Sequence, residues 1–274
     1  MKLSDYATLT LQYHDLAVPN YRYLFVGSRL KLLRAMQTID EVGVDRVLDD
    51  LLVDIEQLTR QVETSDDYIH QMVMCRLVAV NLDLIATLIN KYSVVSNARL
   101  TQLDFGEMGM SRPLISKLPM IHEATKLLDG NPELFDYDGY IPGWMIRLIY
   151  KPNMTTNMVT EQYWPKYIQL SKLSASEFAS KHAAYTTFHM NGSIRNVFGT
   201  MFLLMVGTDE YQKIMGRVHD LNSKLLLINY LLSGKSLPLN NPYGAGYSVI
   251  QNDKKVCFEG PLTDEHGIRC IDVM

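Results

Sequence analysis

The sequence lacks the features that identify nucleic-acid-binding, membrane-surface or disordered proteins. Its 26 Lys and Arg residues are scattered among 30 Asp and Glu residues, so no basic stripe is present for nucleic acid. No polybasic cluster or strongly basic amphipathic helix indicates membrane binding. The opening Met1-Lys2-Leu3 is not followed by an apolar core, so we expect no signal peptide there. With 47% hydrophobic and 20% charged residues, the composition is that of a folded globular protein.

Cysteine is scarce, and its 3 occurrences are unevenly placed. Cys75 lies in a long apolar segment and is expected to be a small buried side chain. Cys257 and Cys270 lie close together near the end of the sequence, where no Cys/His spacing offers a metal site. A disulfide between them would remove loop entropy worth about 3 kcal/mol. We predict this disulfide, and from it an oxidising compartment, although the nearby His266 leaves a reactive thiolate as the alternative.

Motifs of known catalytic and cofactor sites are also missing. Gly234-Lys235-Ser236 ends like a phosphate-binding loop, but Asn229 stands at the first glycine position and a predicted helix precedes it. No G-x-S-x-G sequence marks an acyl-transfer serine, and His122-Glu123 lacks the second histidine of a zinc protease. Asp136–Gly139 lacks the ligand spacing of a calcium loop. The sequence predicts no catalytic residue, no metal and no cofactor, although carboxylates paired only by the fold would escape this search.

What the sequence does contain is helical periodicity. Segment 65–92 places apolar residues on most of its circumference, with Ser65 as the expected N-cap. Such a helix belongs inside a bundle, and Arg76 and Asp83 interrupt it well before the length of a membrane span. Residues 20–39 and 44–62 should form an antiparallel pair that turns at Gly43. Further helices are expected over residues 4–17, 120–128, 156–173, 175–185, 195–206 and 209–232.

The end of the sequence changes character. Residues 247–250 and 256–258 flank a polar Asn-Asp turn, which is the pattern of a β-hairpin. No other segment predicts a strand. We therefore predict a mainly α fold, a multi-helix bundle of antiparallel helix pairs over residues 1–236. A small C-terminal β-hairpin appendage, residues 237–274, should pack on the same domain.

A polar stripe on segment 65–92 is the first candidate binding site. Arg76, Asp83 and Asn90 follow one another at seven-residue spacing, so they share one face of the helix. Neighbours in this stripe are about 10 Å apart, too far for Arg76 and Asp83 to pair directly. The stripe either lines a polar site or meets water or a neighbouring helix, and we favour the second interpretation.

An aromatic loop is the second candidate. Residues 129–144 are dense in turn formers and also carry Phe135, Tyr137, Tyr140 and Trp144. These side chains could form an exposed recognition surface. The alternative, which we favour, is a loop that folds back to seal the core.

Three phrases resemble a known family. Lys151–Asn157 is similar to a p-N-x-T-x-N phrase of an uncharacterised family of bacterial periplasmic proteins anchored in the inner membrane. Asn196–Gly199, followed by Tyr211 and Arg217–Leu221, resembles that family's N-P-x-G, Y and R-x-x-D-L elements, with Val197 in place of proline. Asn241–Gly244 resembles its closing D-P-x-x-G phrase. The resemblance implies a compartment and an anchor, absent from this chain, but no chemistry.

Helix capping offers a physical explanation for two of these phrases. Asn153 and Thr155 precede a helix expected to begin near residue 157, and Asn196 stands at the start of another. Side chains of these types satisfy free backbone N–H groups at helix starts. We favour this structural role over a binding role.

These observations favour a non-enzymatic soluble domain of the cell envelope that binds another envelope protein in the periplasm. One alternative is a hydrolase-type enzyme acting on an envelope peptide or sugar, with a polar pocket built from Arg76, Asp83 and aromatic residues. Another is a carrier of a small molecule or lipid, which requires an apolar cavity. A deep polar cleft with converging carboxylates would favour the enzyme, and a flat apolar patch would favour the binding protein.

Overall fold

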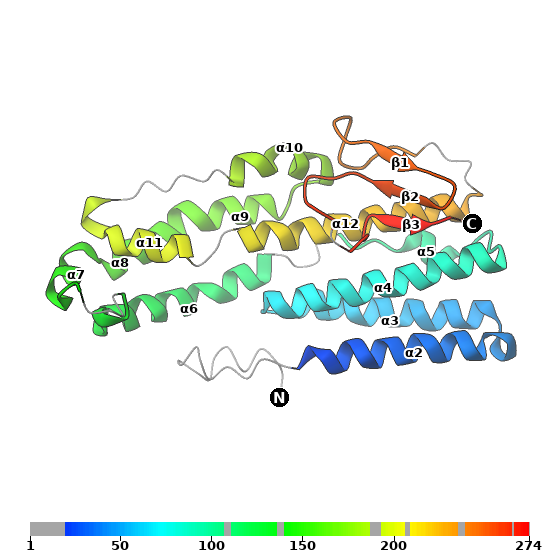
Figure 1. Cartoon of the computed structure of the whole chain (residues 1–274), viewed down its shortest axis with the longest axis horizontal. Helices are drawn as coiled ribbons and strands as arrows, with labels where there is room; N and C mark the ends of the chain where they lie inside the picture. The colour runs from blue at the N-terminus through cyan, green and yellow to red at the C-terminus, as the bar shows by residue number, and fades with distance from the viewer. Residues whose placement is uncertain are drawn as a thin grey trace.

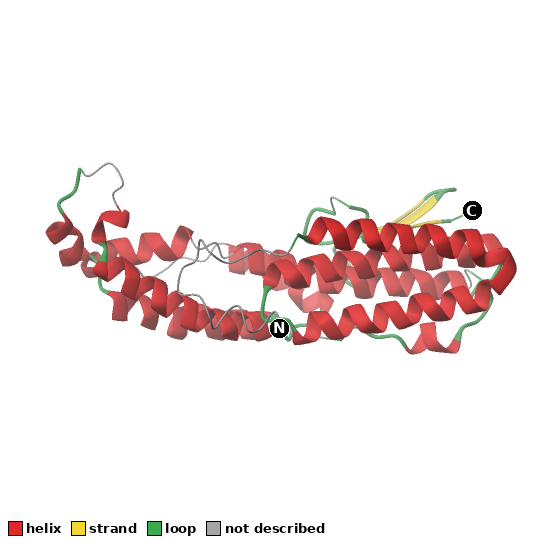
Figure 2. Ribbon diagram, turned by 90° about the horizontal axis from the view of Figure 1, so that it is seen from below, coloured by secondary structure: helices red, strands yellow, loops and turns green. Residues whose placement is uncertain are grey.

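The computed structural model describes residues 20–106, 111–135, 140–186, 193–205, 209–234, 239–264 and 266–273. These residues form an elongated molecule made mainly of helices, with a small sheet near one end (Figure 1). Figure 2 shows the same elongation from a second direction. The fold is the mainly α bundle with a C-terminal hairpin that the sequence predicts. The helix expected over residues 4–17 lies outside the described residues.

Three helices, α2 (Tyr21–Val42), α3 (Val44–Thr64) and α4 (Tyr68–Tyr92), form one end of the molecule (Figure 1). The chain reverses direction at Gly43, whose φ of 86° is rarely adopted by residues with a side chain. α2 and α3 therefore form the predicted antiparallel pair.

The start of α4 differs from the sequence prediction. Asp67 is its N-cap, and the Asp67 carboxylate accepts hydrogen bonds from the backbone N–H groups of Ile69 and His70. Ser65 instead ends α3, and its hydroxyl accepts from the Asp67 backbone N–H at 3.1 Å. The predicted Ser65 cap is wrong because α4 begins at Tyr68, so Asp67 is the residue directly before it and its carboxylate reaches the first free N–H groups.

α4 is the central helix of this end. Contrary to the sequence argument from Arg76 and Asp83, its length and composition would allow it to cross a membrane, yet 61% of its apolar 18-residue window is buried inside the protein. α12 (Asp209–Leu232), which has the predicted bounds, packs along it (Figure 1). Leu82, Ile85 and Leu221 are fully buried in the core that the two helices share. A mostly buried apolar helix of this kind is the core helix of a bundle.

The other end contains the shorter helices (Figure 1). They are α6 (Ser111–Gly130), α7 (Gly143–Ile149), α8 (Pro152–Met158), α9 (Trp164–Leu170) and α11 (Val197–Met205). α5 (Ala98–Gln102) follows α4, and α10 (Ala175–Thr186) lies against α12. The remaining turns are η2 (Pro132–Phe135), the π-helical η3 (Val159–Tyr163) and η4 (Ile194–Asn196).

Several predicted helix bounds need correction at this end. The helix expected over 120–128 is only the second half of α6, which continues through Pro119. The helix expected over 156–173 begins earlier, at Pro152, and is divided by the π-helical turn η3. The capping pair predicted for α10 is present, because Ser174 and Glu177 exchange side-chain hydrogen bonds with each other's backbone N–H groups.

The C-terminal sheet has three antiparallel strands in the order β1 (Val249–Gln251), β2 (Lys255–Phe258) and β3 (Cys270–Asp272). The first two strands are the predicted hairpin, and β3 is an addition that the sequence did not indicate. Cys257 and Cys270 stand opposite each other on β2 and β3 and form the predicted disulfide. The buried apolar side chains of the sheet and of the residues beside β3 belong to the same core as α4 and α12, and they include Val256, Phe258, Ile268, Ile271 and Val273.

Candidate functional site

The polar stripe of α4 meets α12 and the C-terminal segment. Asp83 pairs with Lys224 of α12 at 2.5 Å, and the Lys224 side chain is fully buried although that of Asp83 is 51% exposed. The Lys224 ammonium also donates to the carbonyl of Cys270 at 2.8 Å. Asn90 donates to the carbonyl of Asp272 at 2.7 Å. Asn90 therefore contacts β3 directly, and Asp83 is connected to it through Lys224. A ligand-binding role for Asp83 stays a prediction.

Arg76, the third member, lies apart from this contact. Its side chain is half-buried, and its Nη1 atom is buried without a hydrogen-bond partner among the described residues. Arg76 and Asp83 do not pair within the described chain, as their spacing on the helix requires. The structure therefore does not bring the two residues together as one charged site.

The aromatic loop separates into a buried part and an exposed part. The ring of Phe135 lies 4.7 Å from that of Tyr150 and 5.1 Å from that of Phe198, so Phe135 seals a small apolar cluster. Tyr140 is 84% exposed and Trp144 is 64% exposed. Tyr137 lies outside the described residues. The loop thus both covers the core and presents two large aromatic side chains to solvent.

Helix α7 lies at the far end of the molecule and carries Trp144, and Tyr140 precedes it by three residues (Figure 1). The helix is apolar on both faces, because Ile146 is fully buried while Trp144 and Leu148 face outward. η4 and α11 contact α7 and present further apolar side chains. We call this surface the distal patch and define it by Tyr140, Ile141, Trp144, Met145, Leu148, Ile194, Val197 and Met201.

The two segments that form the distal patch, residues 140–151 and 193–205, carry only positively charged side chains. Residues 140–151 contain Arg147 and Lys151, residues 193–205 contain Arg195, and neither segment contains an acidic residue. Arg147 and Arg195 are exposed, and the ammonium of Lys151 donates to the backbone carbonyl of Arg147 at 2.9 Å. In these two segments the charged residues beside the apolar centre are all basic, and we call them the basic rim. An acidic residue of α6 also lies near, because burial and the charge of Asp129 raise the pKa of Tyr150.

A buried hydrogen-bonded junction supports the patch from beneath. Asn196 is fully buried, and its side-chain oxygen accepts from the Lys151 backbone N–H at 2.8 Å. Its amide nitrogen donates to the hydroxyl of Thr155 at 3.0 Å. A Cβ atom at Gly199 would lie 2.0 Å from that hydroxyl, so only glycine fits there. The phrases 151–157 and 196–199 therefore meet in space.

The capping roles expected for these phrases are wrong in detail. α8 begins with Pro152, so Asn153 and Thr155 lie inside the helix instead of before it. Proline suits the first helical position because it has no N–H to satisfy. At the start of α8 the Lys151 backbone N–H donates to the side-chain oxygen of Asn196, which comes from a distant part of the sequence.

A second buried junction joins α12 to the C-terminal segment. Asp220 is 1% exposed and accepts hydrogen bonds from Tyr243 at 2.7 Å and from Arg269 at 2.9 Å. Arg217 donates to the other Asp220 oxygen at 2.9 Å. Burial, with the neighbouring Asp220 charge, raises the pKa of Tyr243. The phrase that contains Arg217–Leu221 and the phrase Asn241–Gly244 thus also contact each other, through a buried hydrogen-bond network.

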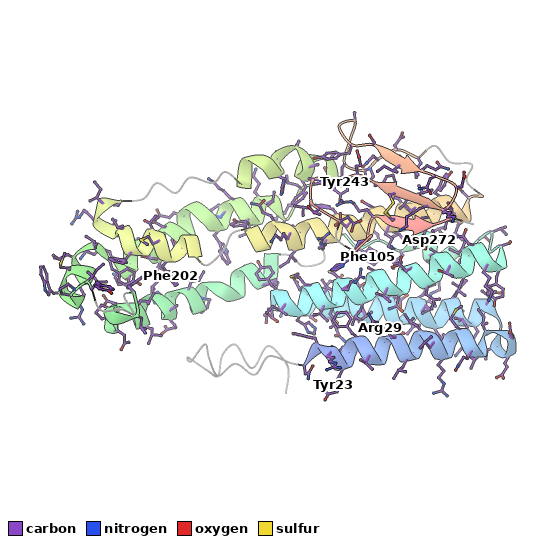
Figure 3. All side chains as sticks on the ribbon, viewed as in Figure 1. Tyr23, Arg29, Phe105, Phe202, Tyr243 and Asp272 are labelled. Carbon is purple, nitrogen blue, oxygen red and sulfur yellow. A yellow bond between two sulfur atoms is a disulfide. The ribbon has the colours of Figure 1, made fainter. Side chains whose placement is uncertain are left out.

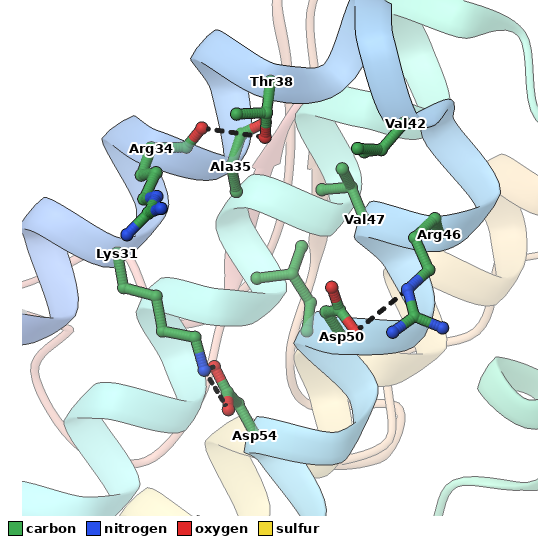
Figure 4. Close-up of a pocket in the computed structure, with 10 residues that line it drawn as sticks. Lys31, Arg34, Ala35, Thr38, Val42, Arg46, Val47, Asp50 and Asp54 are labelled. Carbon is green, nitrogen blue, oxygen red and sulfur yellow. Dashed lines mark hydrogen bonds and ion pairs between the residues drawn. The ribbon is translucent and has the colours of Figure 1, made fainter.

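A shallow groove of about 240 Å³ lies between α2 and α3 (Figure 4). Lys31 pairs with Asp54 across it, and Arg46 pairs with Asp50 at 3.6 Å. Each of these carboxylates is neutralised by a cation on the surface. The groove therefore contains no free pair of carboxylates for general acid–base chemistry.

No residue set described in the structure favours an enzyme or a metalloprotein over a binding protein. The described residues contain no group of three His, Cys, Asp or Glu side chains that could hold a metal ion. The hydrolase and carrier alternatives stay predictions. Comparison with models of protein families, with curated proteins and with solved structures finds no match.

Proposed function

We propose that the protein is a non-enzymatic soluble domain of the cell envelope that binds another envelope protein through the distal patch. The observation that supports this function is the exposure of Tyr140, Trp144 and Leu148 together at one end of an elongated molecule. Clustered apolar side chains of this size are rarely left exposed in a soluble protein without an interaction.

The composition of the patch favours a protein partner. Aromatic residues, methionine and arginine are enriched where protein surfaces meet, and tryptophan and tyrosine dominate binding hot spots. The basic rim of Arg147, Lys151 and Arg195 calls for a partner with acidic residues around an apolar pocket. Three basic residues are fewer than the roughly four to eight that form anionic-lipid binding clusters. A lipid surface is therefore the less favoured occupant.

The patch is also held rigidly from behind. Ile146 and Tyr150 anchor α7 in the small apolar cluster, and the Tyr150 hydroxyl donates to the Thr125 carbonyl of α6 at 2.7 Å. Asn196 fixes the neighbouring segment to the start of α8. A pre-organised surface loses less conformational entropy on binding, which increases affinity.

The proposal also includes a compartment, the periplasm. The Cys257–Cys270 disulfide supports an oxidising environment, because disulfides rarely persist in the reducing cytosol. The resemblance of three sequence phrases supports a periplasmic location with an inner-membrane anchor in the full-length protein. In this arrangement the distal patch would meet its partner outside the inner membrane.

The test compares the wild-type chain with two glutamate variants as immobilised bait for envelope extract. Trp144→Glu places a charge in the patch, whereas the control Ile250→Glu changes a 48% exposed residue on β1. A protein captured by wild type and control, but not by Trp144→Glu, is then purified and titrated against all three chains. We expect Trp144→Glu to weaken binding at least tenfold, or about 1.4 kcal/mol.

Two results would contradict the proposal. One is a partner that binds Trp144→Glu and the control with equal affinity. The other is the absence of any protein partner while wild type binds anionic vesicles and Trp144→Glu does not, which would assign the patch to lipid. A substrate turned over by both variants, with no partner captured, would favour the enzyme alternative.

A further inference from the structure

Helix α2 carries two apolar stripes, and only one of them is covered in the described chain. The inner stripe packs into the main core through Phe25, Leu32 and Ile39. Figure 3 shows Tyr23, a residue of the outer stripe, on the side of α2 that faces away from α3. The outer stripe consists of four exposed side chains, Tyr23 (74%), Val26 (46%), Leu30 (62%) and Leu33 (61%).

Basic side chains border the outer stripe on both sides. Successive residues of a helix are rotated by about 100°, so the outer stripe occupies an arc of about 80°. Arg22 and Arg29 lie on one side of this arc, and Lys31 and Arg34 lie on the other. All four are exposed, and residues 21–39 contain no acidic side chain. The outer face of α2 is therefore an apolar strip between two basic rows.

Three of these four cations have no carboxylate partner among the described residues. Lys31 pairs with Asp54 of α3. No carboxylate in the described part of the chain pairs with Arg22, Arg29 or Arg34. Arg34 lines the groove between α2 and α3, beside Lys31 (Figure 4). The three guanidinium groups are therefore available to an anion outside the molecule.

We propose that the outer face of α2 binds the surface of an anionic phospholipid bilayer. A helix with an apolar face bordered by Lys and Arg lies in the plane of the membrane interface, held by its buried apolar area and by attraction to anionic lipids. The arginine stems lie along the apolar surface while their charged ends reach the headgroup phosphates. Tyr23 suits the same position, because tyrosine is enriched at the level of the headgroups.

The charge and shape of this face favour a bilayer over other occupants. Four basic residues reach the roughly four to eight that form anionic-lipid binding clusters, a number that the distal patch does not reach. α2 lies along the edge of the bundle, so its outer face is a lone ridge that fits a flat surface (Figure 1). A protein would need a groove to cover such a helix. A second copy of α2 would place arginines against arginines.

The sequence alone conceals this surface. Apolar residues occupy both faces of α2, so its pattern does not resemble that of a basic amphipathic helix. The burial of the inner stripe shows that only the outer stripe remains for an interaction. α2 and the distal patch lie at opposite ends of the molecule, so both surfaces can be occupied at once (Figure 1). The lipid proposal therefore stands independently of the proposed protein partner.

The test measures sedimentation of the full chain with two kinds of vesicle. One kind is pure phosphatidylcholine, and the other contains equal parts of phosphatidylcholine and phosphatidylglycerol. Leu30→Glu places a charge in the outer stripe, and its control is Ile250→Glu, at an exposed residue of β1. Circular dichroism checks that both variants keep the helical content of the wild type.

We expect the wild type and Ile250→Glu to bind the anionic vesicles and not the neutral ones. Leu30→Glu should weaken this binding at least tenfold, because a charged side chain opposes insertion of the stripe. Added salt should weaken the binding of the wild type, because it screens the attraction between arginines and phosphates. A wild type that binds neither kind of vesicle would overturn the proposal, and so would equal binding of Leu30→Glu.

A pair of double variants assigns the binding to one basic surface. Arg29→Gln with Arg34→Gln removes two charges beside the outer stripe, and Arg147→Gln with Arg195→Gln removes two from the distal patch. We expect the first double variant to bind anionic vesicles at least tenfold more weakly than the second. The reverse order would assign the lipid to the distal patch and reject this proposal.

A fluorescent probe reports the outer stripe directly. A polarity-sensitive dye is attached to Leu30→Cys, and in the control to Ile250→Cys. Native thiols do not interfere, because Cys75 is buried and Cys257 is bonded to Cys270. Anionic vesicles should shift the emission of the first dye to shorter wavelength and leave the second unchanged. A shift caused by soluble envelope extract but not by vesicles would assign the face to a protein and contradict the lipid proposal.

Discussion

At the scale of single residues, Gly199 matters for packing because it leaves space that any other residue would fill. Gly199 lies where two distant segments touch, and a methyl group there would overlap the Thr155 hydroxyl and the Asn196 amide. Both of those groups are already used, because Asn196 and Thr155 bond to each other and Asn196 also bonds to Lys151. A side chain at residue 199 would therefore disturb the buried hydrogen bonds of Asn196 and Thr155.

Replacing this glycine should destabilise the far end of the molecule. A Cβ atom at residue 199 would lie 2.0 Å from Thr155 Oγ1 and 2.4 Å from Asn196 Oδ1, so we expect Gly199→Ala to cost about 1–3 kcal/mol through overpacking. Gly246→Ala is the control, because a Cβ there meets no atom within 4 Å. Urea unfolding of both variants measures the difference. Equal midpoints would contradict the assigned role of Gly199.

Histidines near the core should make stability depend on pH. Burial lowers the pKa of His219, and the neighbouring Asp220 only partly opposes this effect. The His219 ring lies 5.0 Å from the ring of Phe178. A lowered pKa means that the unfolded chain takes up the proton first. The contribution of His219 to stability is then complete above its unfolded pKa of about 6.5 and is lost as the pH falls towards the folded value.

We therefore expect the melting temperature to fall between pH 7 and pH 5. In His219→Gln the fall should be smaller, because a titrating group has been removed. His266→Gln, at an exposed residue, is the control variant. Thermal melts of the three chains at both pH values test this expectation, which fails if His219→Gln and wild type decline in parallel.

At the scale of helices and strands, the elements with strong local sequence patterns were predicted, and those without such patterns were not. α12 and α10 were predicted closely because their periodic stripes are long and a capping pair marks the start of α10. The strand β3 has only three residues and exists because β2 pairs with it. α7 is also short, with 7 residues, and follows a loop rich in Gly and Pro. Its helical form is supported by packing on Tyr150 and Phe198, which a local pattern does not reveal.

The candidate site was predictable in chemistry but not in extent. Tyr140 and Trp144 were identified because aromatic residues concentrate in one loop. Ile194 and Met201 were missed, because η4 and α11 form a nearly continuous apolar segment that resembles a buried helix. Their exposure depends on where the segment lies in the fold. Helical spacing correctly placed Arg76 and Asp83 too far apart to pair, but Lys224 could be assigned to Asp83 only from the fold.

The junction between α12 and the C-terminal segment should depend strongly on Asp220. Asp220→Ala leaves Arg269, which is 5% exposed, without its carboxylate partner, and we expect a loss of about 3–5 kcal/mol. Asp272→Ala is the control, because that side chain is 79% exposed and lies 3.9 Å from Lys255. Its loss should be about 0–1 kcal/mol. Chemical unfolding measures both losses of stability. Similar losses in Asp220→Ala and Asp272→Ala would contradict this expectation.

At the scale of the whole molecule, the sheet and the helices share one core. Ile271 of β3 and Leu82 of α4 belong to the same apolar cluster, and Lys224 ties α12 to both α4 and β3. From the sequence, reduction of the disulfide would be expected to loosen only the tail. The shared core leads to a different expectation, in which tail and helices lose stability together.

Reduction of Cys257–Cys270 should therefore lower one common unfolding transition. The loop that the disulfide closes is worth about 3 kcal/mol. We expect helical circular dichroism and amide hydrogen exchange in residues 249–273 to report the same decrease. Thiol titration of the denatured chain should give one free thiol before reduction, from Cys75, and three after it. Helices that keep their original midpoint while the sheet exchanges freely would contradict this coupling.

The position of β3 in the core also affects how the chain can be made. Every described helix leaves the ribosome before Cys270–Asp272, yet the Lys224 ammonium and the Asn90 amide find carbonyl partners only in residues 267–272. Until that strand is synthesised, α4 and α12 expose apolar surface, and Lys224 has no carbonyl partner for its ammonium. Completion of the contact between α4 and α12 must therefore wait until residues 267–272 have been synthesised.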